Sequence, residues 1–312
     1  MGPRILFSAP DEHWPLWRPH LLAAFADAGL DVTLTNDPSG PWTFDYVVYQ
    51  PGGPVRDFAP FERIKAVLSL WAGVESIVGD TSIVVPLCRM VDVGLTRGMA
   101  EWVTAHVLRY HMGIDGHILG QDGVWRNSVV PPLAPERTVG ILGLGELGRA
   151  TAAMLTSIGF RVVGWSRGPR ELPGIETWSG AEGLSEVLGA SEILVLLLPA
   201  TPATENTLDA RALAMLPRGA RIINPGRGPL IDDEALLKAL DNGHVGHATL
   251  DVFRQEPLPA EHPYWAHPMV TVTPHIASAT RPETASMAIA ENVRRGEAGL
   301  DFLNVVNRAE SY

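Results

Sequence analysis

A glycine-rich turn constrains this sequence more than any other feature. Gly143, Gly145 and Gly148 form the pattern G-x-G-x-x-G between an expected strand at Thr138–Leu142 and an expected helix at Leu147–Ile158. In this context the first glycine permits a tight turn, the second lets the backbone approach a pyrophosphate, and the third lets helix and strand pack closely. The free N–H groups at the helix N-terminus favour an anion. The flanking elements therefore favour a dinucleotide-binding βαβ unit over an ordinary glycine-rich turn.

The end of the next expected strand predicts which dinucleotide binds. A site for NAD(H) usually places Asp or Glu there to hold the ribose 2′-hydroxyl. In this chain Ser166 stands at that point, and Arg167 and Arg170 follow. A carboxylate would repel a 2′-phosphate, whereas Ser and Arg can bind one through charge-assisted hydrogen bonds. We therefore expect NADP(H) in preference to NAD(H), the alternative being that both arginines belong to a solvated loop.

Composition narrows the class of protein. The chain has 312 residues, 46% hydrophobic and 19% charged, enough for about two domains with buried cores. The longest apolar runs, such as Ile193–Pro199, are too short to span a bilayer, and we see no signal peptide. A net charge of −11 without a Lys/Arg-rich stretch disfavours a nucleic-acid partner. The single cysteine, Cys88, excludes an internal disulfide and fits a reducing compartment, so we expect a cytoplasmic protein without a membrane partner.

Short apolar runs alternate with helical stretches along most of the chain, as they do in parallel βαβ units covered by helices on both faces. The expected strands are Arg4–Ser8, Val32–Thr35, Tyr46–Tyr49, Ala66–Leu70, Ile83–Leu87, Thr138–Leu142, Arg161–Trp165, Ile193–Leu198, Ala220–Asn224, His247–Leu250 and Met269–Thr273. The expected helices are Leu16–Ala28, Arg97–His117, Leu147–Ile158, Leu184–Leu188, Ala210–Met215, Asp232–Asp241 and Pro282–Leu303, and a proline-rich linker is expected at Val129–Pro135.

Three charged or titratable residues follow three successive expected strands in the second half of the chain. They are Arg227, Glu256 and His275. The carboxyl ends of parallel strands meet at one edge of a sheet, where ligands bind, so these side chains can converge in one crevice. Singly, Arg227 is typical of a surface residue, Glu256 of a solvated loop acid and His275 of a structural turn histidine. Their joint occurrence in this order favours a catalytic site.

The segments around these residues resemble the D-2-hydroxyacid dehydrogenase family. Besides the glycine turn, the motifs are Asn224-Pro225-Gly226-Arg227-Gly228, Asp251-Val252-Phe253-Arg254-Gln255-Glu256-Pro257 and Thr273-Pro274-His275-Ile276-Ala277. The resemblance runs from Leu70 to about Pro282. Further segments are similar to the glyoxylate/hydroxypyruvate reductase A branch of that family, namely Met99–Val103, Trp165–Arg167, Glu256–Pro259 and Ile276–Pro282.

This resemblance implies NADPH-dependent reduction of a small 2-keto acid, glyoxylate to glycolate or hydroxypyruvate to D-glycerate. The reaction takes a hydride from the nicotinamide to the carbonyl carbon and a proton to its oxygen. His275 is expected to supply the proton, Glu256 to orient the imidazole, and Arg227 to bind the substrate carboxylate and polarise the keto oxygen. The alternatives are an NAD-dependent phosphoglycerate- or lactate-type enzyme, and a cofactor-sensing binding protein of the same fold.

The resemblance also implies the other ligand contacts. Backbone amides around Trp71, Ala72 and Gly73 are expected to bind the substrate carboxylate, and the Trp71 ring either narrows the pocket or faces away. Asp251 is expected to contact the nicotinamide carboxamide. The expected cofactor residues are Gly143, Gly145, Glu146, Leu147, Gly148, Ser166, Arg167, Arg170, Leu198, Pro199, Thr204, Pro225, Gly226, Asp251 and Ala277. No metal site is expected, because the other histidines show no ligand spacing.

The expected fold is α/β, with two doubly wound parallel-sheet (Rossmann-like) domains. The dinucleotide-binding domain is expected at 102–283. The substrate-binding domain is expected to be discontinuous, 1–101 and 284–312, because the family pattern returns the last helix to it. The same resemblance implies a cleft that closes on the substrate, and a homodimer formed through the long helix after Arg97.

Overall fold

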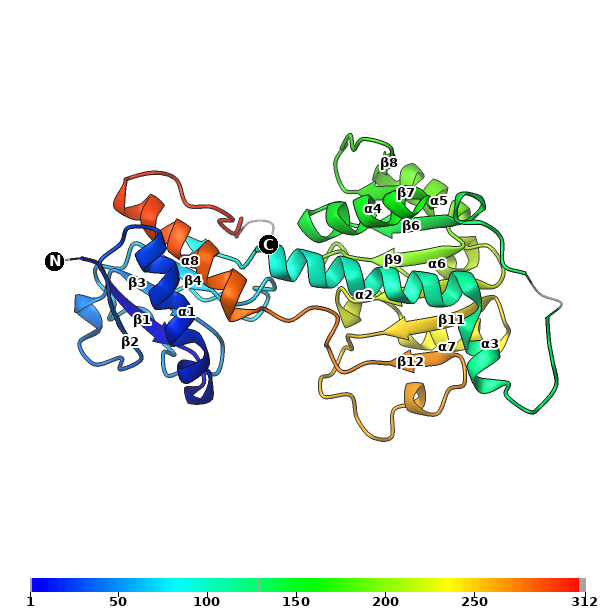
Figure 1. Cartoon of the computed structure of the whole chain (residues 1–312), viewed down its shortest axis with the longest axis horizontal. Coiled ribbons are helices and arrows are strands. Elements are labelled where there is room, and N and C mark those ends of the chain that lie inside the picture. Colours follow the sequence, from blue (N-terminus) through cyan, green and yellow to red (C-terminus); the bar gives the residue numbers. More distant parts are fainter. Residues whose placement is uncertain (1, 128–129, 309–312) are drawn as a thin grey trace. The chain divides into compact units, whose positions relative to one another are not determined.

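The computed structural model describes residues 2–127 and 130–308, which form two compact units (Figure 1). Unit 1 comprises Met1–Leu95 and Thr280–Tyr312, and unit 2 comprises Thr96–Ala279. The start of the expected linker, Val129, lies outside the described residues. The rest of that linker leads into a single 3₁₀ turn, Ala134–Glu136.

Unit 2 is built on a seven-stranded parallel sheet with the order β12-β11-β10-β9-β6-β7-β8. The order reverses between β6 and β9, and in open sheets of this kind ligands bind at that switch point. The strands are β6 (Thr138–Leu142), β7 (Arg161–Ser166), β8 (Glu176–Ser179), β9 (Ile193–Leu196), β10 (Ala220–Asn224), β11 (Val245–Leu250) and β12 (Val270–Val272).

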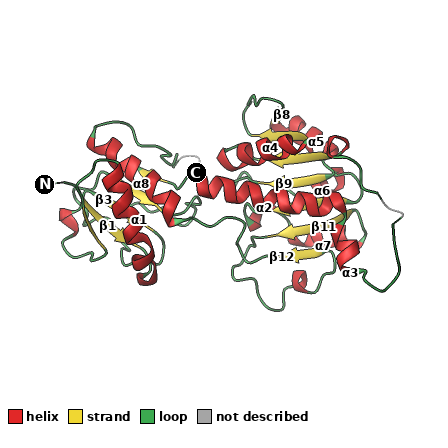
Figure 2. Cartoon of the chain, viewed as in Figure 1, coloured by secondary structure: helices red, strands yellow, loops and turns green. Residues whose placement is uncertain are grey.

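Helices cover both faces of this sheet because its central strands are apolar on both sides (Figure 2). Ile141 and Val195 pack with residues of α2 and α4, whereas Leu142 and Leu196 belong to the core under α5, α6 and α7. The helices are α2 (Val93–Met112), α3 (Ile114–Leu119), α4 (Glu146–Ile158), α5 (Gly180–Ala190), α6 (Ala210–Met215) and α7 (Asp233–Asp241). None of the helices among the described residues is long and apolar enough to cross a membrane.

Unit 1 contains a five-stranded parallel sheet with the order β2-β1-β3-β4-β5. Its helices α1 and α8 pack side by side, although they come from opposite ends of the chain (Figure 1). The elements are β1 (Arg4–Ser8), α1 (Trp14–Asp27), β2 (Thr33–Thr35), β3 (Tyr46–Tyr49), β4 (Ala66–Ser69), β5 (Leu87–Cys88) and α8 (Pro282–Glu297). The two parallel sheets with their helices confirm the expected fold class.

Several expected elements differ from the structure in their bounds. The helix expected at Leu184–Leu188 extends over Gly180–Ala190, and the strand expected at Ile193–Leu198 ends at Leu196. Three further differences have local reasons. The expected strand Ile83–Leu87 is wrong over most of its length, because β5 begins only at Leu87. Ile83 instead fills the core of unit 1 from a loop, and Pro86 has no N–H to donate to a sheet. The expected helix Arg97–His117 is interrupted at Gly113, which has a left-handed φ of +63° and separates α2 from α3. The last helix ends at Glu297 rather than Leu303.

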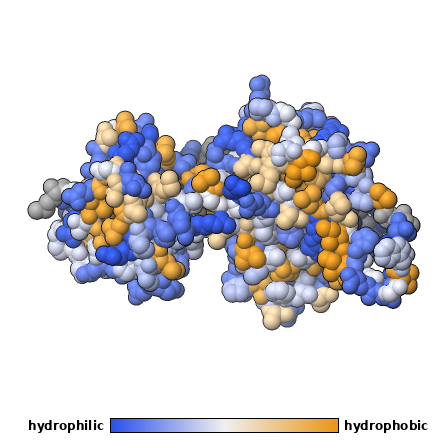
Figure 3. Space-filling view, viewed as in Figure 1, coloured by the Kyte–Doolittle hydropathy of each residue, from blue (hydrophilic) through white to orange (hydrophobic). Residues whose placement is uncertain are grey.

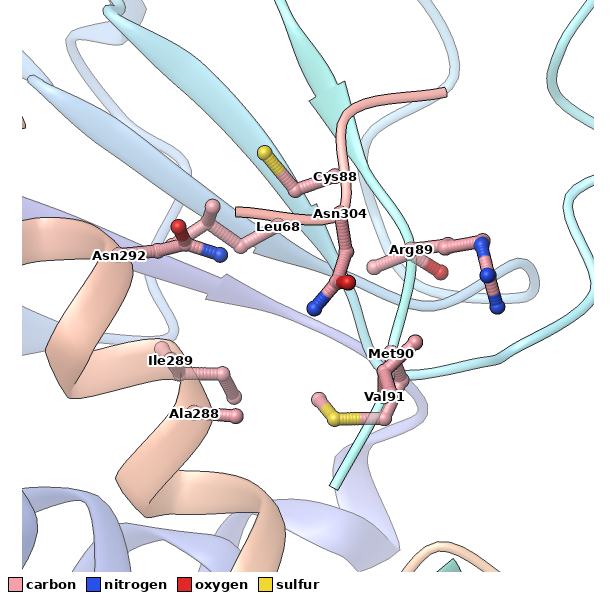
Figure 4. Close-up of a pocket in the computed structure, with 10 residues that line it drawn as sticks. Leu68, Cys88, Arg89, Met90, Val91, Ala288, Ile289, Asn292 and Asn304 are labelled. Atoms are coloured by element: carbon pink, nitrogen blue, oxygen red, sulfur yellow. The ribbon is translucent and has the colours of Figure 1, made fainter. Parts of the chain in front are cut away.

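The C-terminal segment closes unit 1 against β5. The N–H of Arg89 donates to Asn304 at 3.0 Å, and the N–H of Val306 donates to Leu87 at 2.8 Å. A cavity of about 10 Å³ lies beside this contact, large enough for about one water molecule (Figure 4). Cys88 lines the cavity, and burial raises the pKa of its thiol to about 12. At that pKa the thiolate is scarce at neutral pH, so Cys88 is unsuited to nucleophilic chemistry.

A buried polar cluster links α2 to β11. The Tyr110 hydroxyl lies 2.8 Å from His247 Nδ1 and 2.5 Å from Thr249 Oγ1. Burial lowers the pKa of His247 to about 4, with a smaller contribution from the nearby Arg109 guanidinium. His247 is therefore neutral in the folded chain at neutral pH and serves packing.

We expect this cluster to make unit 2 acid-sensitive. Because His247 has a pKa near 4 when folded and about 6.5 when unfolded, the unfolded chain binds the proton first as pH falls. The contribution of neutral His247 to the free energy of unfolding is therefore fully present above about pH 6.5. It is lost progressively as the pH falls toward 4. Thermal unfolding followed across that interval should show Tm falling less steeply for His247→Gln than for the wild-type chain. Parallel curves would contradict this role, because carboxylates titrate alike in both proteins.

Candidate functional site

The three glycines after β6 occupy three different environments. Gly143 has a φ of +106°, and a Cβ there would lie 2.5 Å from the carbonyl oxygen of Leu197. A Cβ on Gly148 would overlap the carbonyl oxygen of Gly143, so only glycine lets α4 start this close to the turn. A Cβ on Gly145, by contrast, would meet no atom within 4 Å. Gly145 is the N-cap of α4 and is exposed, which leaves the helix N-terminus open to a phosphate group.

The loop after β9 lies beside this turn, because Gly143 and Leu197 are in contact across the switch point. Leu198 is buried, and Pro199 and Thr204 are half-buried. The Thr204 hydroxyl donates to the Pro199 carbonyl at 2.7 Å and accepts the Thr201 N–H at 2.9 Å. The expected cofactor residues Leu198, Pro199 and Thr204 thus belong to an internally bonded loop next to the glycine turn.

The end of β7 lies on the other side of the glycine turn, since the Gly143 N–H donates to the Trp165 carbonyl at 2.9 Å. Ser166 is buried, and its hydroxyl donates to the Gly168 carbonyl at 2.7 Å, which fixes the following turn. Arg167 and Arg170 on that turn are exposed. Two exposed cations therefore lie where a dinucleotide on the glycine turn would present its ribose.

Glu256 and His275 form a hydrogen-bonded pair beyond the ends of β11 and β12. His275 Nδ1 lies 2.7 Å from Glu256 Oε2, and the Phe253 N–H donates to Glu256 Oε1 at 2.8 Å. Both carboxylate oxygens therefore have protein partners. The His275 side chain is 54% exposed, so the imidazole is accessible to a ligand while Nδ1 is engaged by the carboxylate.

Asp251 holds the loop that carries His275. Its side chain is fully buried. Oδ1 accepts the Thr273 hydroxyl at 2.6 Å and the Ile276 N–H at 2.9 Å, and Oδ2 accepts the Ala277 N–H at 2.8 Å. Between these contacts His275 adopts a left-handed φ of +54°, a conformation that is uncommon for a residue other than glycine. The buried carboxylate therefore fixes the backbone on both sides of the imidazole.

Arg227 is half-buried in the turn that follows β10. Its Nη1 donates to the Gly226 carbonyl at 2.6 Å. The Asn224 side chain shapes the turn, because its Nδ2 donates to the Arg227 carbonyl at 2.9 Å and its Oδ1 accepts the Gly226 N–H at 3.1 Å. A Cβ on Gly228 would overlap the backbone of Phe253, so the Arg227 turn lies directly against the segment leading to Glu256.

Unit 1 carries the expected substrate residues on the turn after β4. Trp71 is exposed, and Ala72 and Gly73 are half-buried. Ser69 fixes the Trp71 backbone: its hydroxyl accepts the Trp71 N–H at 3.0 Å and lies 3.1 Å from the Trp71 carbonyl, to which it donates. The Met90 N–H donates to the same carbonyl at 2.9 Å. These hydrogen bonds fix the backbone of the turn, and the Trp71 ring is accessible to solvent.

Within unit 2, then, the turns carrying Arg227, Glu256 and His275 lie at the ends of neighbouring strands, and the glycine turn lies at the switch point of the same sheet. Sequence reasoning missed the supporting groups: the Thr273 hydroxyl, the Phe253 amide, and the Arg254 guanidinium, which donates to the Ile231 carbonyl in the turn after Arg227. Their only sequence signal was a position within the matched motifs. In the described part of the chain, no cluster of three or more His, Cys, Asp or Glu side chains could hold a metal ion.

Comparison with known proteins identifies the family. Residues 105–277 match the model described as "D-isomer specific 2-hydroxyacid dehydrogenase, NAD binding domain". A Serratia proteamaculans protein named glyoxylate/hydroxypyruvate reductase A is 41% identical over 276 residues, which cover 84% of this chain and 86% of that protein. The chain therefore belongs to the D-isomer specific 2-hydroxyacid dehydrogenase family, a family of enzymes.

Solved structures of relatives are similar in fold. A D-isomer specific 2-hydroxyacid dehydrogenase from Xanthobacter autotrophicus Py2, in complex with NADPH and MES, has a TM-score of 0.92 and 41% identity over all of both chains. An NADPH-dependent glyoxylate/hydroxypyruvate reductase from Sinorhizobium meliloti, in complex with NADP and sulfate, has a TM-score of 0.84 and 33% identity. That match covers 99% of this chain and 100% of the relative.

The glycine turn yields a paired prediction. Gly145→Ala should fold normally, because its φ of −74° suits alanine and the added methyl meets open space, but the methyl should obstruct a pyrophosphate. Gly148→Ala should instead lower Tm, because the methyl overlaps the Gly143 carbonyl. Thermal unfolding without cofactor and titration with the reduced cofactor separate the two effects. If Gly145→Ala binds cofactor as tightly as the wild type, the turn does not hold the pyrophosphate.

Proposed function

We propose that the protein is an NADPH-dependent reductase of small 2-keto acids, converting glyoxylate to glycolate and hydroxypyruvate to D-glycerate. The observation that carries this proposal is the 2.7 Å contact between His275 and Glu256 at the same sheet edge as the Arg227 turn. A carbonyl reduction needs a proton donor and a cation near the keto acid, and these side chains supply both. Relatives named as glyoxylate/hydroxypyruvate reductases support the choice of substrate.

His275 is the proposed general acid. Because Nδ1 contacts the Glu256 carboxylate, Nε2 is the ring nitrogen left to give its proton to the keto oxygen. Glu256 fixes the ring orientation and stabilises the imidazolium before the proton leaves. The Phe253 N–H holds the second carboxylate oxygen, so Glu256 cannot easily turn away from the imidazole.

Arg227 is the proposed carboxylate-binding residue. A guanidinium presents a planar fork of donors that matches a carboxylate and can also polarise the adjacent keto oxygen. Binding the substrate would use donors additional to the one that contacts the Gly226 carbonyl. In the same proposal, the backbone amides of Ala72 and Gly73 in unit 1 bind the substrate carboxylate. The Trp71 N–H is held by the Ser69 hydroxyl, and the exposed Trp71 ring limits the size of the substrate.

NADP(H) is the proposed cofactor, and when bound its reduced nicotinamide supplies the hydride. The open space at Gly145 and the free N-terminus of α4 fit its pyrophosphate. Arg167 and Arg170 fit the 2′-phosphate, because both guanidinium groups belong to exposed residues on the turn after β7. The hydroxyl of Ser166, also a proposed cofactor residue, donates to the Gly168 carbonyl and fixes the start of that turn. Relatives were solved with NADPH and with NADP bound, which supports the same preference. Residues 102–283 are the proposed dinucleotide-binding domain, and 1–101 with 284–312 the substrate-binding domain.

We also propose a homodimer formed through the end of α2 and the segment after it. On the face that Figure 3 shows, hydrophobic residues mostly lie singly or in small groups among hydrophilic ones. This segment instead exposes a series of large apolar side chains: Met112, Ile114, Ile118, Leu119, Val124 and Trp125. Such a series is typical of a protein interface. Light scattering should give twice the 33.7 kDa chain mass, and Trp125→Glu with Leu119→Glu should reduce it to one chain. A wild-type monomer would refute the dimer.

The proposed activity is tested by following absorbance at 340 nm with glyoxylate, hydroxypyruvate and bulkier 2-keto acids, each with NADPH and NADH. We expect the two small acids to be reduced fastest. We expect kcat/KM to be about 10- to 100-fold higher with NADPH, the size expected for charge-assisted hydrogen bonds to a phosphate. Equal kcat/KM values with NADPH and NADH would refute the predicted preference for NADPH. If no keto acid were reduced, the proposed reductase activity would be refuted and only cofactor binding would remain.

His275→Gln is the control variant for this assay. It should lower kcat by about 100- to 10,000-fold, the usual range for removing a general acid. Binding of NADPH should be unchanged, because the substitution leaves the glycine turn and the β7 turn intact. Full activity of His275→Gln would show that another group donates the proton.

A further inference from the structure

Arg254 lies two residues before Glu256, and its guanidinium reaches across to two other loops. Nη2 donates to the Ile231 carbonyl at 2.7 Å and the Pro229 carbonyl at 3.3 Å, both in the turn that follows Arg227. The same nitrogen donates to the Asn206 side-chain oxygen. Asn206 lies just beyond Thr204, in the loop after β9. One side chain therefore joins the loops that follow β9, β10 and β11.

The contacts around this guanidinium lock these loops to one another. The Asn206 N–H donates to the Pro229 carbonyl at 2.9 Å, and Asn206 has a left-handed φ of +52°. Gly228 fits against the backbone of Phe253 and Arg254 with no room for a Cβ. The backbones of the three loops thus meet at one place, and Arg254 Nη2 binds the two carbonyls of the Arg227 turn there.

Two ion pairs add to the hydrogen bonds of the Arg254 guanidinium. Arg254 Nη1 lies 3.4 Å from Glu205 Oε1, and Nε lies 3.7 Å from Asp233 Oδ2. Only 34% of the Arg254 side-chain surface is exposed, so these ion pairs are partly shielded from solvent. A lysine would keep the charge, but its single ammonium group cannot reproduce contacts that Arg254 makes through three separate nitrogens: Nη2 to the two neighbouring loops, Nη1 to Glu205 and Nε to Asp233.

We propose that Arg254 is a positioning residue, which sets the Arg227 guanidinium relative to the Glu256–His275 pair by tying together the loops that carry Arg227 and Glu256. This role rests on the proposed function. Arg254 binds backbone carbonyls that come two and four residues after Arg227, and it precedes Glu256 by two residues. A shift of either loop is therefore transmitted to Arg227, which is proposed to bind the substrate, or to Glu256, which orients His275. A displacement of about 1 Å at such a site can cost about 100-fold in rate.

The decisive experiment is a double-mutant cycle in kcat/KM for glyoxylate, built from Arg254→Met and Arg227→Lys. We expect Arg254→Met to lower kcat/KM by about 10- to 100-fold, mainly through a higher KM, because Arg227 binds the carboxylate. If Arg254 acts through Arg227, adding Arg254→Met to Arg227→Lys should cost no more than roughly twofold further. Arg211→Met, an exposed arginine on α6, is the matched control and should match the wild type.

Two further measurements separate positioning from general destabilisation. Arg254→Lys should recover part of the lost kcat/KM. Arg254→Ala opens space beside an existing cavity of about 180 Å³, so millimolar guanidinium chloride should restore activity whereas urea should not. Fully additive losses in the cycle, or wild-type kinetics for Arg254→Met, would overturn the proposed role. The wild-type assay is run first: failure there refutes the proposed function itself, and the role of Arg254 falls with it.

Discussion

The candidate site depends on one buried carboxylate. Asp251 directly follows β11, is inaccessible to solvent, and accepts hydrogen bonds from the Thr273 hydroxyl and from the amides of Ile276 and Ala277. A buried carboxylate is costly unless donors surround it, and here the donors come from the loop after β12. The hydrogen bonds that stabilise the buried Asp251 carboxylate therefore also fix the position of His275. The unusual backbone at His275 is tolerated because it is constrained from both sides.

Close backbone contacts connect this constraint to the rest of unit 2. Gly143 meets Leu197, and Gly228 meets Phe253, at distances that leave no space for side chains. These two contacts join the loops after β6 and β9, and those after β10 and β11. Side chains then complete the network: Ser166 fixes the β7 turn, Asn224 the Arg227 turn, and Arg254 the junction of three loops. The sheet supplies the common edge, while these groups set the positions of the loops on it.

The sequence was most informative where apolar runs are bounded by polar or glycine residues. The strands Thr138–Leu142 and Ala220–Asn224 and the helix Ala210–Met215 agree with the structure at both ends. The strand Glu176–Ser179 was missed because an edge strand of sequence ETWS has no apolar periodicity. Ile83 was misassigned because a buried loop residue and a strand residue carry the same local signal.

Within the candidate site, motif resemblance predicted the Glu256–His275 pair but not the protein groups that hold Asp251 and Glu256. It named Glu256 and His275, whose contact the structure shows, and assigned Asp251 to the nicotinamide. The structure shows protein donors on both Asp251 oxygens, and a contact with the cofactor stays a prediction. Those donors could not be foreseen, because they depend on the φ of His275 and on the register between β11 and β12. The role of Arg254 could not be predicted for a similar reason, because its hydrogen-bond acceptors are distant from it in the sequence.

The discontinuity of unit 1 has a consequence for how the chain is made. Its sheet is built from the N-terminal part of this sequence, yet α8 packs on α1, and Glu297 accepts hydrogen bonds from Tyr46 and Lys65. The segment that closes β5 comes later still, at Asn304–Val306. Every residue of unit 2 is therefore synthesised before unit 1 has its last helix. During translation β1 to β5 therefore emerge without α8, the helix that packs beside α1 in the folded unit.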